Sequence, residues 1–532
     1  MKTSALTAVF LTALAISPAC GEPYLPSWTN TNGVTIHGEF IRLEGESLLI
    51  RKDGKEFKVP LEKLSEESRE QALEMASSPQ SAPEEPSGPA KDFGKQADPD
   101  HQRKLAVFIL AKIGKVTVTS GSREIAAATV DDLPKGRLSI KSLEAIGEPF
   151  TDEDAALLNG CGDLTRLVLH GATLEGLPLA SLPALQYLEM EECGIAAGQF
   201  HSLMGHKKLA EILITSHASP SMGGLIPILA TCPGLTSIRL HKAGLAAAPL
   251  APLSKLRLLK TLSLGGNDYT DADLSALQDF PSLVELALQE TDLGNHTLDF
   301  LPKLKSLQTL NLYKSKIQEK CHANIASTRG LTCLSLYSSN ATNPILHALS
   351  GHKTLRELHV SLTQITGEAL IGLAPMPGVT EFHIGSDKSR IDDAAAKSLA
   401  QTFPNAAYVS FYPDLRSGGY KAIADLRRLA YLRLHSCATL DDDSVRALAG
   451  MKKLNRLQIS GPAVTNTGLQ LLEPLKSQLI ELSLSGARID DEAVPTLAKF
   501  RSLSLLEITE TGISREGADR LRKALPVCKV TY

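Results

Sequence analysis

The stretch Leu283-Val284-Glu285-Leu286-Ala287-Leu288, followed by Leu293, decides the fold of this chain. The same spacing recurs in the next unit, as Leu307-Gln308-Thr309-Leu310-Asn311-Leu312 followed by Ile317. The first apolar position of the pattern falls at residues 140, 164, 185, 209, 235, 259, 283, 307, 331, 355, 379, 406, 429, 454, 479, 503 and 527. The mean spacing is about 24 residues, and a fixed period of this size indicates a solenoid of stacked units.

Each unit is expected to contain a short strand, and the strands are expected to stack in parallel along one curved sheet. The second half of a unit is expected to be helical, because residues 273–277 and 491–497 carry apolar side chains three or four positions apart. Helix starts are indicated at Thr151-Asp152, Thr270-Asp271, Asp392-Asp393, Asp441 to Asp443, Asp490-Asp491 and Ser514, whose side chains can cap free backbone amides. The run at 441–443 is also compatible with a calcium site, but its recurrence at one repeat position favours capping.

Residues 140–532 resemble the leucine-rich-repeat family, in a helix-bearing subtype of 24 residues that is common in exported bacterial proteins. The resemblance implies an α/β solenoid with parallel strands on the concave face and helices on the convex face. Residues 101–139 depart from the pattern. A helix over 105–113 and a strand over 116–118 are predicted there, as an N-terminal cap over the first repeat.

A small all-β domain is predicted at residues 24–76. The pairs Asn32-Gly33, Glu44-Gly45 and Asp53-Gly54 separate predicted strands at 34–43, 47–52 and 56–59, in a meander that should curl into an SH3-like barrel. Trp28, Gly38-Glu39-Phe40 and the segments 48–55 and 59–65 resemble the Sla-homology domain, an SH3-like module that binds peptide sorting motifs in endocytic adaptors. Trp28 and Phe40 are interpreted as core residues, and peptide binding is the alternative.

The first residues are typical of an export signal at 1–19, because Lys2 precedes an apolar run at 5–16 and small residues occupy 17 and 19. Cys20 leaves a lipid anchor open, although soluble export is favoured. Residues 77–100 contain five prolines among polar residues and are predicted to be a disordered linker. No apolar run is long enough to cross a membrane. The expected location is the periplasm, the cell envelope or the extracellular space.

Charge and motifs exclude several classes of function. The chain has 55 basic and 59 acidic residues, and the predicted concave positions carry no basic stripe, so nucleic acid is not an expected partner. No HExxH, GxSxG or P-loop motif occurs. We therefore expect no enzyme and no cofactor. The eight cysteines form no CxxC pair. Cys193 and Cys437 occupy the eighth position after the first leucine, where a small polar or thiol side chain can bond to the turn of the next repeat.

Binding is the remaining class, because side chains between the strand leucines point to the concave face. The candidate binding patch comes from six consecutive strands and consists of Tyr313, Tyr337, His359, His383, Tyr408, Tyr412, Tyr431, Arg433 and His435. Aromatic residues with arginine are typical of binding hot spots. His359 and His383 share one repeat position, but no Asp or third His accompanies them there, so a metal site is not the favoured interpretation.

The predicted function is that of an exported, non-enzymatic interaction protein whose concave face binds a protein, peptide or glycan. The alternative is a structural envelope scaffold that acts by self-association or by packing on the cell wall. Because the patch holds three histidines, whose ordinary pKa is near 6.5, binding is expected to vary between about pH 5.5 and 7.5.

Overall fold

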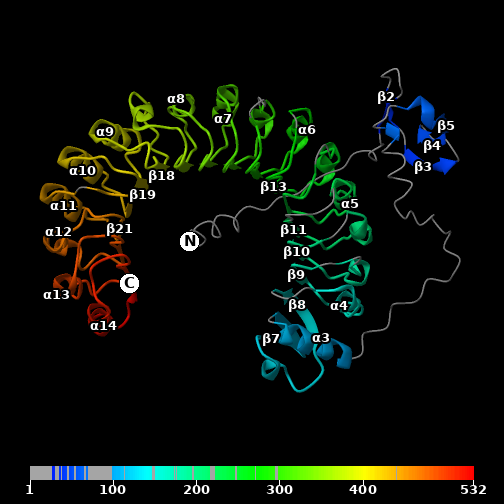
Figure 1. Ribbon diagram of the computed structural model, residues 1–532, viewed down its shortest axis with the longest axis horizontal. Coiled ribbons are helices and arrows are strands. Elements are labelled where there is room, and N and C mark those ends of the chain that lie inside the picture. Colours follow the sequence, from blue (N-terminus) through cyan, green and yellow to red (C-terminus); the bar gives the residue numbers. More distant parts are fainter. Residues whose placement is uncertain are drawn as a thin grey trace.

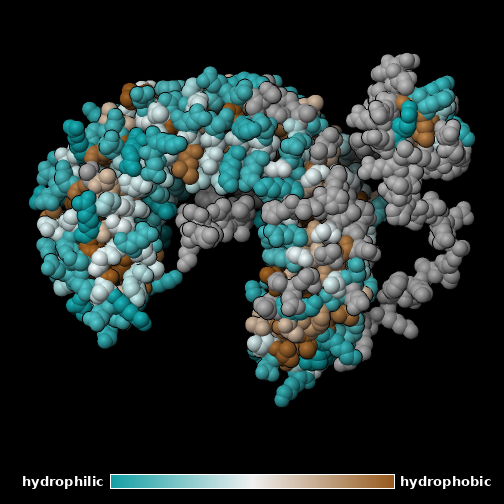
Figure 2. Space-filling model, in the orientation of Figure 1, coloured by the Kyte–Doolittle hydropathy of each residue, from teal (hydrophilic) through white to brown (hydrophobic). Residues whose placement is uncertain are grey.

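A computed structural model describes residues 27–29, 35–37, 39–44, 47–52, 55–64, 68–69 and 99–532, except 113, 147–149, 173, 175–176, 195–196, 216–221, 246–247, 270, 294–297 and 439. Most of these residues form an open arch in which strands line the inner side and helices the outer side (Figure 1). Hydrophilic residues cover most of the surface of the arch that Figure 2 shows. The predicted signal peptide at 1–19, Cys20 and most of the predicted linker at 77–100 lie outside the described residues.

In the described part of the chain, seventeen parallel strands form the inner wall of the arch, one for each predicted repeat. They are β8 (Ser139–Ala145), β9 (Arg166–His170), β10 (Tyr187–Glu191), β11 (Glu211–Thr215), β12 (Ser237–His241), β13 (Thr261–Ser263), β14 (Glu285–Ala287), β15 (Thr309–Asn311), β16 (Cys333–Ser335), β17 (Glu357–His359), β18 (Glu381–Ile384), β19 (Tyr408–Phe411), β20 (Tyr431–Leu434), β21 (Arg456–Ile459), β22 (Glu481–Ser483), β23 (Leu505–Glu507) and β24 (Lys529–Thr531). Each pairs with the next in register, as Leu286 does with Leu310. Among the described strands β24 pairs only with β23, so the sheet ends there.

The sheet buries alternate residues because side chains in a strand point to opposite faces. Leu283, Leu286, Leu288 and Leu293 are all 0% exposed and form part of one continuous core between the sheet and the outer layer. Glu285, which lies between two of these leucines, is half-buried on the other face. The leucine spacing of the sequence is therefore the spacing of the core.

The outer layer contains α-helices in some repeats, 3-10 helices in others, and both in a third group. The α-helices are α4 (Asp152–Ala156), α5 (Leu225–Leu229), α6 (Asp271–Ser275), α7 (His322–Ala326), α8 (Pro344–Ala348), α9 (Asp393–Thr402), α10 (Ser417–Ala424), α11 (Asp442–Ala449), α12 (Asn466–Leu471), α13 (Val494–Leu497) and α14 (Arg515–Ala524). The 3-10 turns are η3 (Leu179–Ser181), η4 (Ala197–Leu203), η5 (Ala251–Lys255), η6 (Ala276–Asp279), η7 (Leu301–Lys303), η8 (Glu319–Cys321), η9 (Gly367–Leu370), η10 (Glu473–Leu475) and η11 (Asp491–Ala493). The prediction of an α-helix in every repeat is wrong, because some repeats contain only 3-10 helices. In η5 the Leu253 amide donates to the Leu250 carbonyl and the Leu256 amide donates to the Leu253 carbonyl, which are the i to i−3 hydrogen bonds of a 3-10 helix.

Acidic side chains cap α9 and α11, as the sequence predicts. An Asp392 carboxylate oxygen accepts a hydrogen bond from the Ala395 amide at 2.8 Å and starts α9. Asp441 accepts from the Ser444 amide at 2.7 Å and starts α11. The hydrogen bonds from Ser444 hold the pKa of Asp441 below its usual value. This aspartate therefore acts as a helix cap in the structure.

The eighth position of the repeat forms a ladder of polar contacts. The Asn267 amide nitrogen donates to the Leu240 carbonyl at 2.7 Å, and the Ser315 hydroxyl donates to the Leu288 carbonyl at 2.6 Å. The Cys193 thiol contacts the Leu169 carbonyl in the same way, at 3.4 Å. These side chains bond to the preceding repeat, not to the next one as predicted.

Residues 99–139 cover the first repeat. Helix α3 (Pro99–Ala111) buries Leu105 and Ile109. The hairpin of β6 (Lys115–Ser120) and β7 (Arg123–Ala127) is followed by η2 (Val130–Asp132), and β6 also pairs antiparallel with β8. Helix α3 begins at Pro99, two residues inside the predicted linker, because proline is favoured in a first helical turn.

The N-terminal part of the chain contains two small antiparallel sheets. One pairs β1 (Ser27–Thr29) with β2 (Thr35–His37), and the other has the order β3 (Glu39–Glu44), β4 (Ser47–Lys52), β5 (Lys55–Pro60), followed by η1 (Leu61–Lys63). The predicted strand over 34–43 is therefore two strands with different partners. The three-stranded meander agrees with the sequence, while closure into a barrel remains a prediction.

The structure adds two observations on covalent state and membrane association. All seven cysteines in the described part of the chain are free thiols. Within the same residues, no helix has the length and apolar character needed to cross a membrane.

Candidate functional site

The candidate patch lies on the concave side of β15 to β20, as the strand alternation predicts. In β17, Leu358 points into the core, while Glu357 and His359 share the opposite face. His359 is nonetheless only 4% exposed. Its burial results from side chains of neighbouring strands that stack over it.

Eight of the nine predicted residues meet in ring-to-ring contacts. The stacked pairs are Tyr313–Tyr337 at 5.7 Å between centroids, His359–His383 at 4.3 Å, Tyr408–Tyr431 at 4.2 Å and Tyr412–His435 at 4.7 Å, and His383 meets Tyr408 edge-on at 4.5 Å. His359, His383, Tyr408 and Tyr431 therefore form one continuous row across β17 to β20, which we call the aromatic row. Contacts of this kind hold the rings in fixed positions relative to one another.

The two remaining pairs, Tyr313–Tyr337 and Tyr412–His435, flank a part of the face with small residues. The equivalent positions on the two strands between them are Ser361 and Gly385. Gly385 has a φ of +90°, and a Cβ there would lie 2.8 Å from the Ser389 carbonyl oxygen, so glycine is required. Tyr337 is 38% exposed at the edge of this region. The concave face thus presents two aromatic pairs separated by a stretch without large side chains.

Arg433, the ninth residue, lies among the tyrosines. Its Nε is buried without a hydrogen-bond partner, and it forms no ion pair with any carboxylate in the described part of the chain. Burial raises the pKa of Tyr408. The charge of Arg433 and a hydrogen bond from the Arg433 side chain oppose that rise. The same charge acts on Tyr337 and Tyr412, whose pKa values burial also raises.

Two of the three histidines are neutral over the physiological pH range. Burial lowers the pKa of His359 to about 4, with a contribution from the charge of His383. Burial likewise lowers the pKa of His435 to about 4, with a contribution from the charge of Arg433. The His435 Nε2 lies 2.8 Å from the Ser410 hydroxyl. The expected pH response between 5.5 and 7.5 therefore does not come from these two rings, because the stacked neighbours remove the water that would stabilise their charged forms.

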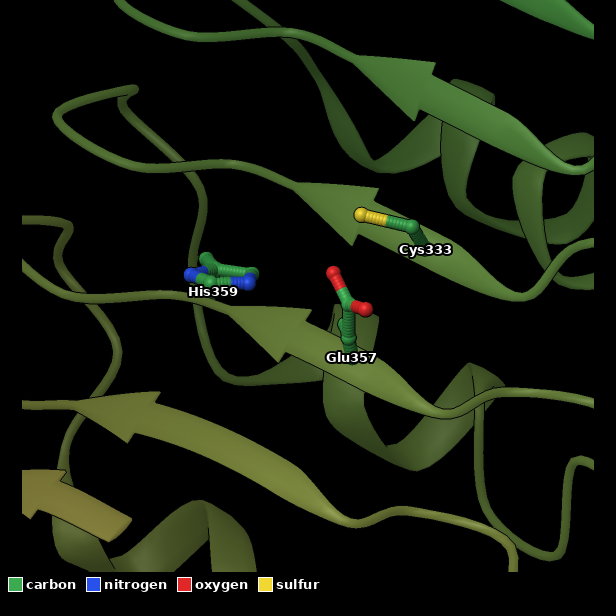
Figure 3. A group of neighbouring side chains, drawn as sticks. All are labelled: Cys333, Glu357 and His359. Atoms are coloured by element: carbon green, nitrogen blue, oxygen red, sulfur yellow. The ribbon is translucent and has the colours of Figure 1, made fainter. Parts of the chain in front are cut away.

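Sequence reasoning missed three side chains beside the aromatic row: Cys333, Glu357 and Glu381. Glu381 Oε1 lies 2.8 Å from His383 Nε2 and 3.7 Å from His359 Nε2. Figure 3 shows Cys333 and Glu357 on adjacent strands, with His359 further along the same strand as Glu357. The signal was present as Glu-x-His in both Glu357-Leu358-His359 and Glu381-Phe382-His383. A spacing of two puts both side chains on one face of a strand.

The carboxylate and thiol of this group have shifted pKa values. Burial opposes ionisation of Glu381, but the hydrogen bond from His383 and the two imidazoles hold its pKa below its usual value. Burial raises the pKa of the Cys333 thiol strongly, and the Glu357 carboxylate raises it further. Cys333 is therefore a neutral thiol in the protein without a bound cation.

The N-terminal arm of the concave face is different in kind. Arg166 lies over the Tyr187 ring at 3.9 Å, pairs with Glu144 at 3.6 Å and pairs with Glu189 at 3.4 Å. The Tyr187 hydroxyl donates to Glu189 at 2.6 Å. Arg166 is thus paired with carboxylates of the protein, whereas Arg433 is paired with none in the described part of the chain.

Fold and site together define a solenoid of the leucine-rich-repeat type with an aromatic surface on its concave side. The family model described as Leucine Rich repeat matches residues 351–374, a single repeat that contains β17. No curated protein matches the chain.

Solved structures with a similar arrangement include an internalin from Listeria monocytogenes, at 18% identity and a TM-score of 0.38, covering 71% of this chain and 88% of that one. A leucine-rich-repeat protein of Leptospira interrogans is 17% identical with a TM-score of 0.40, covering 74% and 90% of the two chains. The leucine-rich-repeat ectodomain of a plant membrane receptor kinase from Arabidopsis thaliana, in complex with Casparian strip integrity factor 2, is 14% identical with a TM-score of 0.41, covering 81% and 55%.

Proposed function

We propose that this chain is an exported, non-enzymatic interaction protein that binds a protein, peptide or glycan on the concave face of β15 to β20. Export is inferred from the signal-like residues 1–19. The binding role rests on side chains that the fold itself does not require, since the leucine core is complete without them.

Arg433 carries the proposal. A guanidinium that is partly removed from water is costly unless an anion or hydrogen-bond acceptors satisfy it. Within the described residues, no carboxylate pairs with this one, and the neighbouring groups are tyrosines and His435. A carboxylate on the ligand would complete the site, through charge-assisted hydrogen bonds of the kind that arginine forms well. The favoured ligand is therefore a peptide or glycan with an acidic group.

The shape of the surface favours an extended ligand. Six neighbouring strands span about 24 Å, because adjacent strands lie about 4.8 Å apart. The two aromatic pairs on either side of Ser361 and Gly385 provide flat, rigid faces against which a peptide side chain or a sugar ring can stack. A protein partner would need further contacts to reach a standard interface of about 800 Å² per side.

The test is affinity capture from an envelope extract with the full chain, followed by affinity measurement on whatever is captured. Tyr337→Ala and Arg433→Ala should each weaken binding at least about tenfold, as hot-spot truncations do. The control is Thr236→Ala, a substitution directly before β12 in the N-terminal arm, which should leave affinity unchanged. Loss of affinity at Thr236 alone, or self-association as the only interaction found, would reject this surface and favour the scaffold.

The N-terminal meander is proposed to be an SH3-like Sla-homology domain. The support is the order β3-β4-β5, together with the sequence segments at 48–55 and 59–65. Export and the state of Cys20 can be tested by intact mass measurement of the protein recovered from the envelope. A mass beginning at residue 20 without a lipid is expected, and an acylated Cys20 would show anchoring instead.

A further inference from the structure

Two Glu-x-His segments on adjacent strands bring four chemically active side chains to one place. Strands β17 and β18 pair in register, so Glu357 lies opposite Glu381 and His359 opposite His383. One potential ligand atom from each of His359, Glu381 and His383 lies within 4.8 Å of the other two. All three side chains come from the centre of the concave face, on strands that the leucine core holds in position.

The carboxylates in this arrangement lack cationic partners. Like charges directly opposite each other on neighbouring strands destabilise a sheet. In the described part of the chain, neither Glu357 nor Glu381 forms an ion pair with a lysine or arginine, and the contacts of Glu381 at 2.8 and 3.7 Å are with the imidazoles of His383 and His359. A bound cation would relieve the repulsion between these two glutamates.

The distances between these ligand atoms are close to those of a transition-metal site. Zn²⁺ binds nitrogen and carboxylate oxygen at about 2.0 to 2.2 Å in tetrahedral sites, so neighbouring ligand atoms lie about 3.4 Å apart. The two distances from Glu381 Oε1, 2.8 Å to His383 Nε2 and 3.7 Å to His359 Nε2, lie on either side of that value. The two imidazole rings are nearly parallel, with an interplanar angle of 18°, and both present Nε2 to the same oxygen.

We propose that His359, Glu381 and His383 bind one divalent transition-metal ion, with Zn²⁺ as the test ion. Two histidines and one carboxylate form a ligand set that leaves a further coordination position open. Glu357 lies close enough to supply or orient a fourth ligand, because it pairs in register with Glu381. The inference does not depend on the proposed partner, since the metal can be tested alone.

A second trio, formed by Cys333, Glu357 and His359, shares one histidine with the first and is the competing arrangement. In the first trio, Glu381 Oε1 lies 2.8 Å from His383 Nε2 and 3.7 Å from His359 Nε2, so one carboxylate oxygen faces both imidazoles. We therefore assign the ion to His359, Glu381 and His383, and Cys333 provides the experiment that separates the two arrangements.

The experiment is calorimetric titration of the metal-free full chain with ZnCl₂. One ion per chain is expected to bind to the wild type. Glu381→Gln and His383→Gln should each weaken binding at least about 100-fold, because even the loss of residues that only support a metal ligand costs 10- to 100-fold. The matched control is Glu481→Gln, at the equivalent position of β22, and its Zn²⁺ affinity should equal that of the wild type.

Cys333→Ser should also retain binding, and the Co²⁺-loaded wild type should lack a thiolate charge-transfer band in the near ultraviolet. Circular dichroism of each variant confirms that it folds. Absence of one-to-one binding by the wild type would overturn the proposal. Binding that survives both Glu381→Gln and His383→Gln, or that is lost in Cys333→Ser, would overturn it as well.

Discussion

Asn267 offers the sharpest test of how the repeats hold together. The side chain is 3% exposed. Its oxygen accepts from the Ala243 and Leu245 amides at 3.0 and 3.2 Å. Its nitrogen donates to the carbonyls of Leu240 and Leu264 at 2.7 and 2.9 Å. The Gly265 carbonyl also lies 3.2 Å from this nitrogen, but the nitrogen carries only two hydrogens, so one side chain satisfies four backbone groups in two repeats.

The cost of Asn267→Ala follows from those four groups. Each amide or carbonyl left unpaired in a buried site costs at least about 1 kcal/mol. The free energy of unfolding should therefore fall by about 4 kcal/mol. Thr511 occupies the same repeat position but donates only within its own turn, to the Ile508 carbonyl. Thr511→Ala should therefore cost about 1 kcal/mol.

Urea unfolding followed by circular dichroism measures both losses, and hydrogen exchange of the peptide around residues 240–250 localises the first. Because solenoids can unfold in parts, exchange is the more direct readout. The Ala243 and Leu245 amides should exchange faster in Asn267→Ala and at the wild-type rate in Thr511→Ala. Equal losses of stability for the two variants, with no change in exchange at these amides, would refute the ladder as a source of cohesion.

Two further predictions concern the strand alternation and the response to acid. Leu286→Ala should lower the free energy of unfolding by about 2 to 5 kcal/mol, because the side chain is fully buried. Glu285→Ala, on the opposite face, should lower it much less. Equal losses in urea titrations would mean that the strand phase is wrong. Burial and the Arg433 charge lower the pKa of His435 from 6.5 to about 4, so the unfolded chain takes up a proton that the folded chain does not. This ring should therefore contribute a loss of up to about 3 kcal/mol in the free energy of unfolding as the pH falls from 6.5 to 4. Because burial also lowers the pKa of His359 to about 4, that ring should add a loss of its own. His435→Gln should therefore reduce the slope in pH-resolved urea titrations, and an unchanged slope would contradict the assignment.

The sequence predicted the solenoid well because one physical rule repeats along it. Each unit needs leucines on one side of a strand and on the inner side of the segment that follows. Both requirements recur every 24 residues, and this produces the observed spacing. The register of all seventeen parallel strands follows from that spacing. The short 3-10 turns were not predicted, because apolar spacing over four or five residues does not distinguish them from an α-helix.

The candidate site could be predicted as a set of residues but not as a set of contacts. Position in the repeat identified the concave side chains, including Tyr337 and Arg433. Repeat position alone did not reveal that Glu381 lies beside two histidines. Glu381 and His383 occupy different repeat positions, but they are two residues apart on one strand and therefore share a face. The lowered pKa of His359 could not be predicted either, since its burial depends on stacking between strands.

The central claim is that the ligand lies on the concave face of β15 to β20, and site-specific photo-crosslinking tests it most directly. A benzophenone amino acid would replace Tyr337 in one full-length variant and Thr236 in another, and each would be irradiated in the same envelope extract. The account predicts one discrete adduct at position 337, suppressed when Arg433→Ala is added, and none at 236. An adduct at 236 with none at 337 would place the ligand on the N-terminal arm and contradict the account.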